Sequence, residues 1–286
     1  MRRVKLIECP RDAMQGIKSH FIPTEAKIRY INALLKVGFD TIDFGSFVSP
    51  KAIPQMRDTA QVLSKLEHNT SESKLLAIVA NIRGADDASK FDEIDFLGYP
   101  FSISENFQMR NTSKTISQSI LILDEILSIA EKCNKQVVVY LSMGFGNPYG
   151  DPWSVEIVME WTKKLSEMGI KIISLSDTIG SSTPKIIHQL FSNLIPNYTQ
   201  IEFGAHLHTA PTTWFEKIEA AYTSGCNRFD GAIKGYGGCP MAKDELTGNM
   251  PTEKLISYFN QQKAKTNISG TTFESAYNEA FKIFNN

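Results

Sequence analysis

Two histidines separated by one residue, His206 and His208, stand at the end of a β-rich run. On an extended strand residues i and i+2 project to the same side, so both imidazoles can converge on one cation. The carboxylate of Asp12 and the amide oxygen of Asn249 would complete a mixed nitrogen and oxygen ligand set. Such a set suits Mg²⁺ or Mn²⁺ more than an all-protein zinc site. The sequence therefore predicts a divalent-metal site, and the alternative is a pair of ordinary hydrogen-bonded histidines.

Two further side chains carry chemistry of their own. Arg11, next to Asp12, offers a fixed positive charge beside the predicted metal, although an Arg-Asp pair is also typical of a surface salt bridge. Cys239 lies in the glycine-rich segment Gly235–Pro240, which could close over a substrate and bring a thiol with it. The alternative for a single cysteine is an inert thiol. The glycines within residues 144–150 lack the spacing of a dinucleotide-binding loop, so nucleotide binding is not expected.

The chain alternates short β-rich runs with amphipathic stretches, and eight such pairs can be counted. The expected strands are Val4–Glu8, Thr41–Gly45, Leu75–Ala80, Glu93–Leu97, Val137–Ser142, Lys171–Ser176, Gln200–Ala205 and Arg228–Ala232. The expected helices are Thr24–Val37, Pro54–Leu66, Ile82–Lys90, Thr115–Lys132, Pro152–Met168, Pro184–Leu194, Thr212–Ser224 and Thr252–Gln262.

Several helix boundaries carry independent signals. Thr24 and Thr252 could cap their helices with a hydroxyl group. Pro152 and Pro184 fit a first helical turn, where the missing N–H would have no intrahelical partner. Left-handed glycines are expected to close helices before three of the strands. They are Gly38, Gly169 and Gly225.

Eight alternating units favour a closed (β/α)₈ TIM barrel of the α/β class, because an open doubly wound sheet more often has about five or six strands. We expect one domain over residues 1–286, with the barrel over about 1–262 and a C-terminal extension over about 263–286. A helix at Thr272–Phe284 would pack outside the barrel. Catalytic groups of such barrels lie at the carboxyl ends of the strands, and the chemistry-bearing residues named above fall at these ends.

The composition excludes several classes of protein. The 286 residues include 30 Lys+Arg and 31 Asp+Glu, a formal charge of −1, which argues against nucleic-acid or anionic-membrane partners. No apolar run approaches the roughly 20 residues of a membrane-spanning helix, and no signal peptide is visible, so a cytoplasmic protein is expected. The 4 cysteines are widely spread without a Cys-x-x-Cys pair, which predicts reduced thiols.

Longer motifs resemble those of the 3-hydroxy-3-methylglutaryl-CoA (HMG-CoA) lyases, within the aldolase-type metal-dependent lyase barrels. The resemblance covers nearly the whole chain. The matching segments are Pro10–Gln15, Ser46–Lys51, Pro54–Met56, Ser174–Gly180, His206–His208, Gly237–Pro240 and Thr247–Asn249. Ser46–Lys51 and the cysteine loop, Gly237–Pro240, are more specific to this family than the metal motif, which related synthases and aldolases share.

This resemblance implies cleavage of HMG-CoA to acetyl-CoA and acetoacetate, a retro-Claisen reaction assisted by Mg²⁺ or Mn²⁺. The implied metal ligands are Asp12, His206, His208 and Asn249. Arg11 would stabilise the enolate of the departing acetyl-CoA, and Asp177 and Cys239 would take part in proton transfer. The residues expected to contact the acyl-CoA thioester are Gln15, Asp43, Ser46, Asn111 and Thr178. The helical extension also makes a homodimer the expected assembly.

The chain departs from the family pattern at several positions. Thr209–Thr213 stands where the family has an acidic residue and a Thr-Tyr-Gly run, Asp43 replaces a glutamate, and Cys9 and Ala13 replace glycines. Two alternatives therefore stay open. One is a related lyase or aldolase acting on another 3-hydroxyacyl-CoA or on a hydroxy-oxo acid, and the other is a catalytically silent acyl-CoA binder. The cysteine loop disfavours a Claisen-type synthase.

Overall fold

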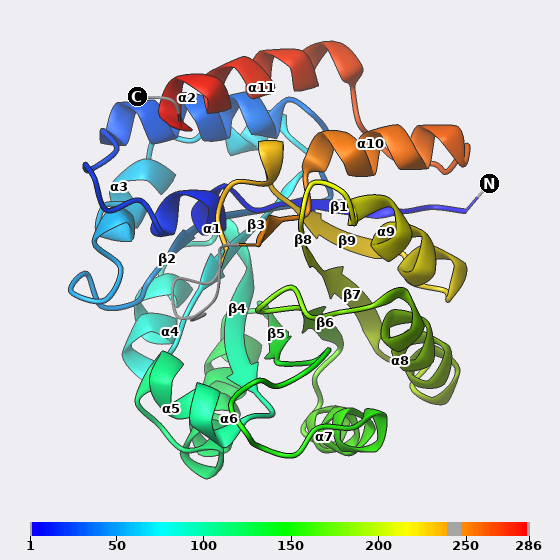
Figure 1. The fold of residues 1–286 in the computed structure, drawn as a ribbon. Coiled ribbons are helices and arrows are strands. Elements are labelled where there is room, and N and C mark those ends of the chain that lie inside the picture. The colour runs from blue at the N-terminus through cyan, green and yellow to red at the C-terminus, as the bar shows by residue number, and fades with distance from the viewer. Residues whose placement is uncertain (1, 239–246, 285–286) are drawn as a thin grey trace.

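The computed structural model describes residues 2–238 and 247–284. Parallel strands close into a barrel in the order β1-β2-β3-β4-β5-β6-β7-β9, with helices around the outside (Figure 1). These strands are β1 (Lys5–Glu8), β2 (Thr41–Ser46), β3 (Lys74–Ile78), β4 (Ile94–Ser102), β5 (Gln136–Ser142), β6 (Ile172–Ser176), β7 (Glu202–His206) and β9 (Arg228–Gly231). β1 pairs with β2 on one side and with β9 on the other, which closes the barrel. The predicted (β/α)₈ architecture is confirmed.

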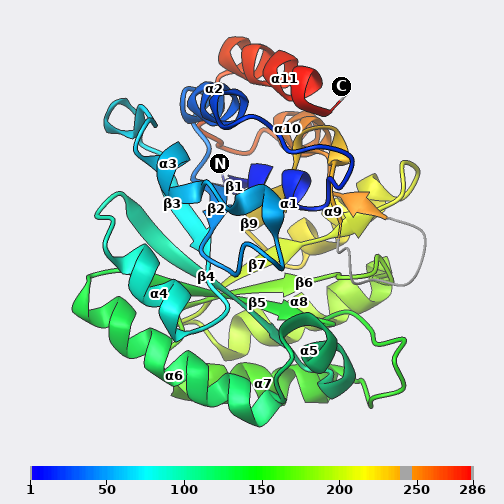
Figure 2. The same cartoon turned by 90° about the vertical axis from the view of Figure 1, so that its left-hand side faces the viewer.

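Helices alternate with the strands and cover the barrel. They are α1 (Pro10–Gln15), α2 (Thr24–Leu35), α3 (Thr59–Leu63), α4 (Ile82–Ser89), α5 (Glu105–Thr112), α6 (Ile116–Lys132), α7 (Val155–Glu167), α8 (Pro184–Asn197), α9 (Trp214–Thr223), α10 (Thr252–Gln261) and α11 (Gly270–Phe284). The C-terminal helix α11 packs on α2 outside the barrel, as expected (Figure 2). None of the helices in the described ranges is both long and apolar enough to cross a bilayer.

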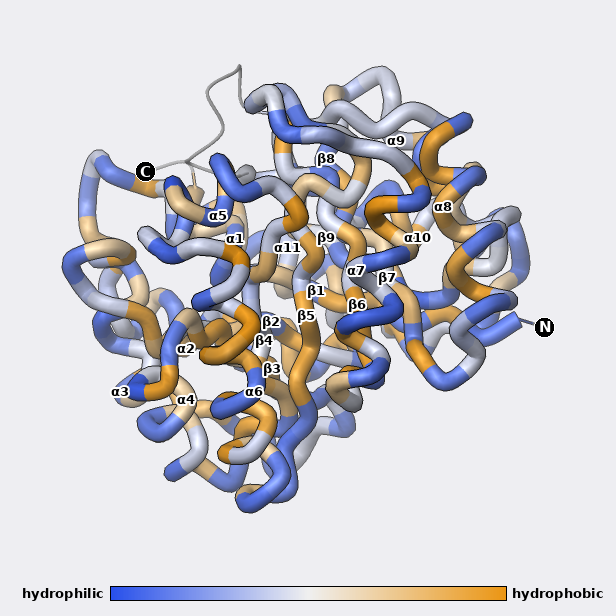
Figure 3. Tube along the Cα trace, turned by 90° about the horizontal axis from the view of Figure 1, so that it is seen from below, coloured by the Kyte–Doolittle hydropathy of each residue, from blue (hydrophilic) through white to orange (hydrophobic). Residues whose placement is uncertain are grey.

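Two short strands lie outside the barrel and matter for the site. β8 (His208–Thr209) and β10 (Gly248–Asn249) form a small antiparallel sheet. Apolar residues run along the strands near the centre of the molecule, and hydrophilic residues dominate its periphery (Figure 3).

The observed bounds of β4 and of nearby helices differ from those predicted from the sequence. The expected strand ended at Leu97, but β4 extends to Ser102 because its residues from Gly98 to Ser102 pair in parallel with β5. α5 follows β4 and was not expected, since its sequence is polar. Its N-terminus is nevertheless well capped, because the Ser104 hydroxyl accepts the Phe107 N–H over 3.1 Å. The expected helix at 54–66 is divided into a 3-10 turn and α3.

Two of the expected helix caps are wrong. The hydroxyl of Thr24 donates to Asp58 over 2.7 Å, and that of Thr252 donates to Glu8 over 2.6 Å, so both bind distant carboxylates. α7 begins three residues after Pro152, although Pro184 does occupy the first turn of α8. The expected left-handed glycines are confirmed by their φ values. These are +95° for Gly38, +94° for Gly169 and +106° for Gly225.

Glu8, at the end of β1, ties the barrel to the segment that follows β9. Its fully buried carboxyl accepts the Ile233 N–H over 2.9 Å and the Thr252 hydroxyl over 2.6 Å. Burial raises the pKa of Glu8 to about 8, against the opposing effect of these hydrogen bonds. The carboxyl is therefore mostly protonated at neutral pH.

We expect Glu8→Gln to flatten the dependence of stability on pH. Folding raises the pKa of this carboxyl from 4.5 to about 8, so the native state binds the proton more tightly than the unfolded chain does. The resulting stabilisation is complete below pH 4.5 and is lost as the pH rises through 8. Between pH 5 and pH 9 the unfolding free energy of the wild type, measured by urea denaturation, should fall by roughly 4 kcal/mol more than that of Glu8→Gln. The exposed variant Glu72→Gln should keep the wild-type dependence, and equal losses in all three proteins would contradict a protonated Glu8.

Candidate metal centre

The carboxyl end of the barrel brings the predicted metal ligands together. One ligand atom each of Asp12, His206 and His208 lies within 4.8 Å of the others. Asn249 joins them because β10 pairs with β8 in a register that sets Asn249 opposite His208. Its Nδ2 donates to Asp12 over 2.6 Å and to the Tyr236 carbonyl over 2.9 Å. Asn249 therefore lies beside Asp12, and its role as a ligand through the amide oxygen stays a prediction.

The protonation of these groups fits a divalent cation. Nε2 of His208 is buried and has no hydrogen-bond partner among the described residues. Burial and the neighbouring His206 lower the pKa of His208 to about 4, so its imidazole is neutral and can ligate. Burial alone would raise the pKa of Asp12, but Arg11 and the two histidines outweigh it and lower the pKa. A carboxylate thus faces a neutral imidazole with an orphaned nitrogen, which is a set of groups that a divalent cation satisfies.

Arg11 is held between two carboxylates. Its Nε lies 3.1 Å from both oxygens of Asp43, and its Nη1 lies 2.9 Å from Asp12 Oδ1. The side chain is only 9% exposed, so the alternative of a surface salt bridge is wrong. Burial raises the pKa of Asp43 to about 6, although Arg11 opposes that rise. Arg11 is therefore a fixed cation that directly contacts a predicted metal ligand.

The predicted substrate contacts occupy different surroundings. Gln15 donates to Asp12 Oδ1 over 2.6 Å and so orients a metal ligand in this structure. The Ser46 hydroxyl donates to the Ile78 carbonyl over 3.3 Å, and Asp43 binds Arg11 as described. The remaining two are Thr178, whose hydroxyl accepts the Met143 N–H over 3.0 Å, and Asn111, half-buried in α5. The roles of these residues toward substrate stay predictions.

Asp177 is anchored by a residue that sequence reasoning missed. Lys217, on α9, donates to Asp177 Oδ2 over 2.9 Å and to the His208 carbonyl over 2.8 Å. The other oxygen of Asp177 accepts the Ser182 N–H over 2.9 Å. Lys217 is only 3% exposed, and its position on an otherwise apolar face of α9 is the signal that could have revealed it. The carboxylate of Asp177 thus fixes the backbone that carries His208, and its role in proton transfer stays a prediction.

The glycine-rich segment before Cys239 approaches the metal ligands closely. Gly237 has a φ of +91°, and a Cβ there would lie 2.7 Å from Asn249 Nδ2 and 2.8 Å from the Asp12 carbonyl oxygen. Only glycine fits this position. Cys239 itself lies outside the described residues, so its proposed chemistry stays a prediction.

Comparisons with known proteins agree with this geometry. The chain matches the HMGL-like family over residues 3–278. It is 33% identical to the hydroxymethylglutaryl-CoA lyase of Bacillus subtilis over 91% of this chain and 85% of the relative. It is 32% identical to the cytoplasmic 3-hydroxy-3-methylglutaryl-CoA lyase of Homo sapiens over 93% of this chain and 71% of the relative.

Solved structures show the same likeness. The crystal structure of the B. subtilis HMG-CoA lyase superposes with a TM-score of 0.91 at 32% identity, covering 99% of this chain and 94% of the other. An HMG-CoA lyase from A. baumannii, in complex with coenzyme A and 3-methylmalate, superposes with a TM-score of 0.89 at 28% identity. That match covers 98% of this chain and 91% of the other.

Proposed function

This chain belongs to the HMGL-like family, and on that premise we propose that it is a metal-dependent lyase that cleaves HMG-CoA to acetyl-CoA and acetoacetate. The observation that carries the proposal is the cluster of Asp12, His206 and His208 beside the buried guanidinium of Arg11. Relatives at 32–33% identity bear the name of this activity, which supports the choice of substrate.

The proposed mechanism assigns a task to each group. Asp12, His206, His208 and Asn249 would hold the cation, which lowers the cost of the alkoxide formed at the substrate's tertiary hydroxyl. Arg11, kept charged by its two carboxylate neighbours, offsets the negative charge that develops on the thioester oxygen of the acetyl-CoA enolate. In this proposal Cys239 and Asp177 take part in proton transfer.

Several finer assignments belong to the same proposal. Mg²⁺ or Mn²⁺ is the expected ion because the ligand set mixes carboxylate, amide and imidazole. An acyl-CoA thioester is the expected partner, and the A. baumannii relative solved with coenzyme A supports it. A cytoplasmic location and a homodimer are also proposed, the homodimer on the basis of the extension that contains α11.

Acetoacetate release tests the function directly. Purified protein, incubated with HMG-CoA and either Mg²⁺ or Mn²⁺, should release acetoacetate, and EDTA should stop the release because the ion stabilises the alkoxide. No acetoacetate under any divalent metal would contradict the proposal.

Each of the two alternatives predicts a different result, one in turnover assays with other substrates and one in binding measurements. Turnover of another 3-hydroxyacyl-CoA or a hydroxy-oxo acid in preference to HMG-CoA would identify the related lyase, for which the unusual segment Thr209–Thr213 is the motivation. The hydroxyl groups of Thr209 and Thr213 bind each other, with 2.9 Å between their oxygens. Tight thioester binding in calorimetry without any product would identify the silent binder.

A further inference from the structure

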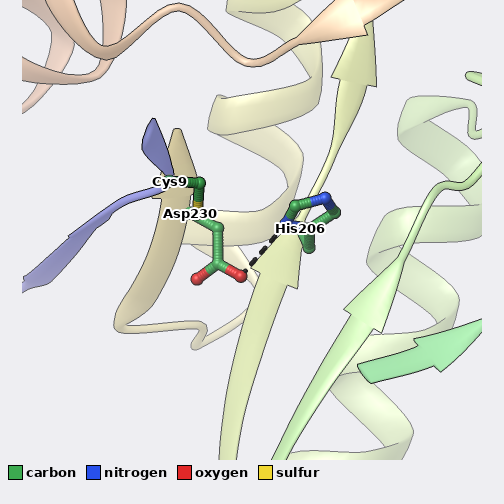
Figure 4. A group of neighbouring side chains, drawn as sticks. All are labelled: Cys9, His206 and Asp230. Carbon is green, nitrogen blue, oxygen red and sulfur yellow. Dashed lines mark hydrogen bonds and ion pairs between the residues drawn. The ribbon is translucent and has the colours of Figure 1, made fainter. Parts of the chain in front are cut away.

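A carboxylate that the sequence did not single out lies directly behind the metal ligand His206. Asp230, on β9, points at the imidazole, and its Oδ2 lies 3.1 Å from His206 Nδ1 (Figure 4). The same oxygen accepts the Ser174 hydroxyl over 3.0 Å. We propose that Asp230 is a positioning residue that holds His206 with Nδ1–H toward the carboxylate and Nε2 toward the cation. This inference rests on the metal site of the proposed function.

The geometry leaves His206 one orientation for binding. An imidazole has two nitrogens, and the hydrogen bond that one of them makes decides which nitrogen remains for a metal. With Nδ1 engaged by Asp230, Nε2 is the nitrogen that can meet the group formed with Asp12 and His208. The edge of the His206 ring also packs against Tyr140, with 5.6 Å between the ring centroids and an angle of 83° between the planes. A 180° flip of the ring would break the hydrogen bond to Asp230, and smaller rotations would also disturb the contact with Tyr140.

A buried arginine, Arg228, places a positive charge near the Asp230 carboxylate. Arg228 lies two residues earlier on the same strand, is 1% exposed, and attracts the Asp230 carboxylate. Its Nη1 also reaches Glu202 Oε1 over 3.2 Å on the neighbouring strand β7. A carboxylate behind a ligating histidine accepts the hydrogen bond from Nδ1–H and so fixes the tautomer.

Cys9 lies against the same pair of residues. One ligand atom each of Cys9, His206 and Asp230 lies within 4.8 Å of the others, so the trio has the spacing of a metal site of its own (Figure 4). Such a site would need His206 Nδ1, which the hydrogen bond to Asp230 already occupies. The structure thus favours Asp230 as a partner of the ligand rather than as a ligand itself, and Cys9→Ala separates the two readings.

Binding of Mn²⁺ to the full chain, measured as free Mn²⁺ by EPR, tests the proposal. Asp230→Asn should weaken Mn²⁺ affinity by about 10- to 100-fold, the usual effect of losing a carboxylate behind a ligating histidine. The matched control is Asp58→Asn, which removes a buried carboxylate paired with Lys27 outside the barrel, 2.7 Å from its Nζ. Asp58→Asn and Cys9→Ala should both stay within about twofold of the wild type.

A second readout avoids dependence on the metal and on turnover. ¹⁵N NMR of the histidine nitrogens in metal-free protein should show the Nδ1–H tautomer of His206 in the wild type. Asp230→Asn should show a mixture of tautomers, and Ser174→Ala a smaller change in the same direction, since Ser174 only steadies the carboxylate.

The outcomes separate this inference from the function on which it rests. Unchanged Mn²⁺ affinity and tautomer in Asp230→Asn, with binding lost in Asp12→Ala, would overturn the positioning role alone. Equal weakening by Cys9→Ala and Asp230→Asn would overturn it too, because Asp230 would then act as a ligand. Failure of the wild type to bind Mn²⁺ would overturn both the inference and the metal site.

Discussion

Alanine at Asp12 or at His208 should lower kcat/KM for HMG-CoA by at least roughly a thousandfold. The expected size follows from metal-ion catalysis, which supplies several kcal/mol of transition-state stabilisation, about tenfold for each 1.4 kcal/mol. Asp12 contributes the carboxylate of the cluster, and His208 contributes a neutral imidazole whose Nε2 has no other partner among the described residues. Each substitution removes one predicted ligand of the cation and should therefore also abolish saturable binding of Mn²⁺.

The measurement is steady-state acetoacetate release across a range of Mn²⁺ concentrations. His188→Ala is the control, because this histidine is exposed on α8 and its Nδ1 lies 2.8 Å from the Ser224 hydroxyl, away from the predicted ligands. It should behave like the wild type. Turnover near the wild-type level in both ligand variants would show that these residues do not hold the catalytic ion.

Arg11→Met should lower kcat by about 10²- to 10³-fold, the typical cost of removing one group that stabilises an oxyanion. Affinity for Mn²⁺ should change little, since Asp12 keeps its hydrogen bonds from Gln15 and Asn249. The fold will lose stability as well, because Asp43 is fully buried and loses its only cationic partner among the described residues, Arg11.

A double variant separates these two effects. Arg11→Met combined with Asp43→Asn removes the unpaired buried charge, so thermal unfolding should return toward the wild-type midpoint while turnover stays low. If the double variant regained turnover together with stability, Arg11 would be a structural residue. Near-normal turnover in Arg11→Met alone would refute its role at the enolate.

Much of the fold could be predicted because its signals are local. The alternation of β-rich and amphipathic runs identified every barrel strand to within a few residues, apart from the end of β4. The expected strand ended at Leu97, whereas β4 continues to Ser102 because its last residues pair with β5, a contact that local sequence does not reveal. The threonines before α2 and α10 had the right identity for caps, but distant carboxylates compete for their hydroxyls.

In the site, too, the residues that stand in local motifs could be predicted and the others could not. Its ligands stand in motifs at strand ends, so the sequence could bring Asp12, His206 and His208 together. Lys217 and Asp230 have no motif, and their importance comes from side-chain contacts across 40 and 24 positions of sequence, respectively. Contacts of that kind depend on how neighbouring strands and helices are registered, which periodicity does not specify.

The pairing of β10 with β8 also brings the last predicted ligand to be synthesised beside the first. Asn249 meets Asp12 across 237 positions of sequence, while β1, which leads into Asp12, is among the first elements to be made. A nascent chain therefore carries only Asp12 of the four predicted ligands until His206 and His208 are made, and Asn249 follows these histidines. If the four residues are the ligands, as proposed, a complete coordination sphere can form only after the segment with Asn249 has been synthesised.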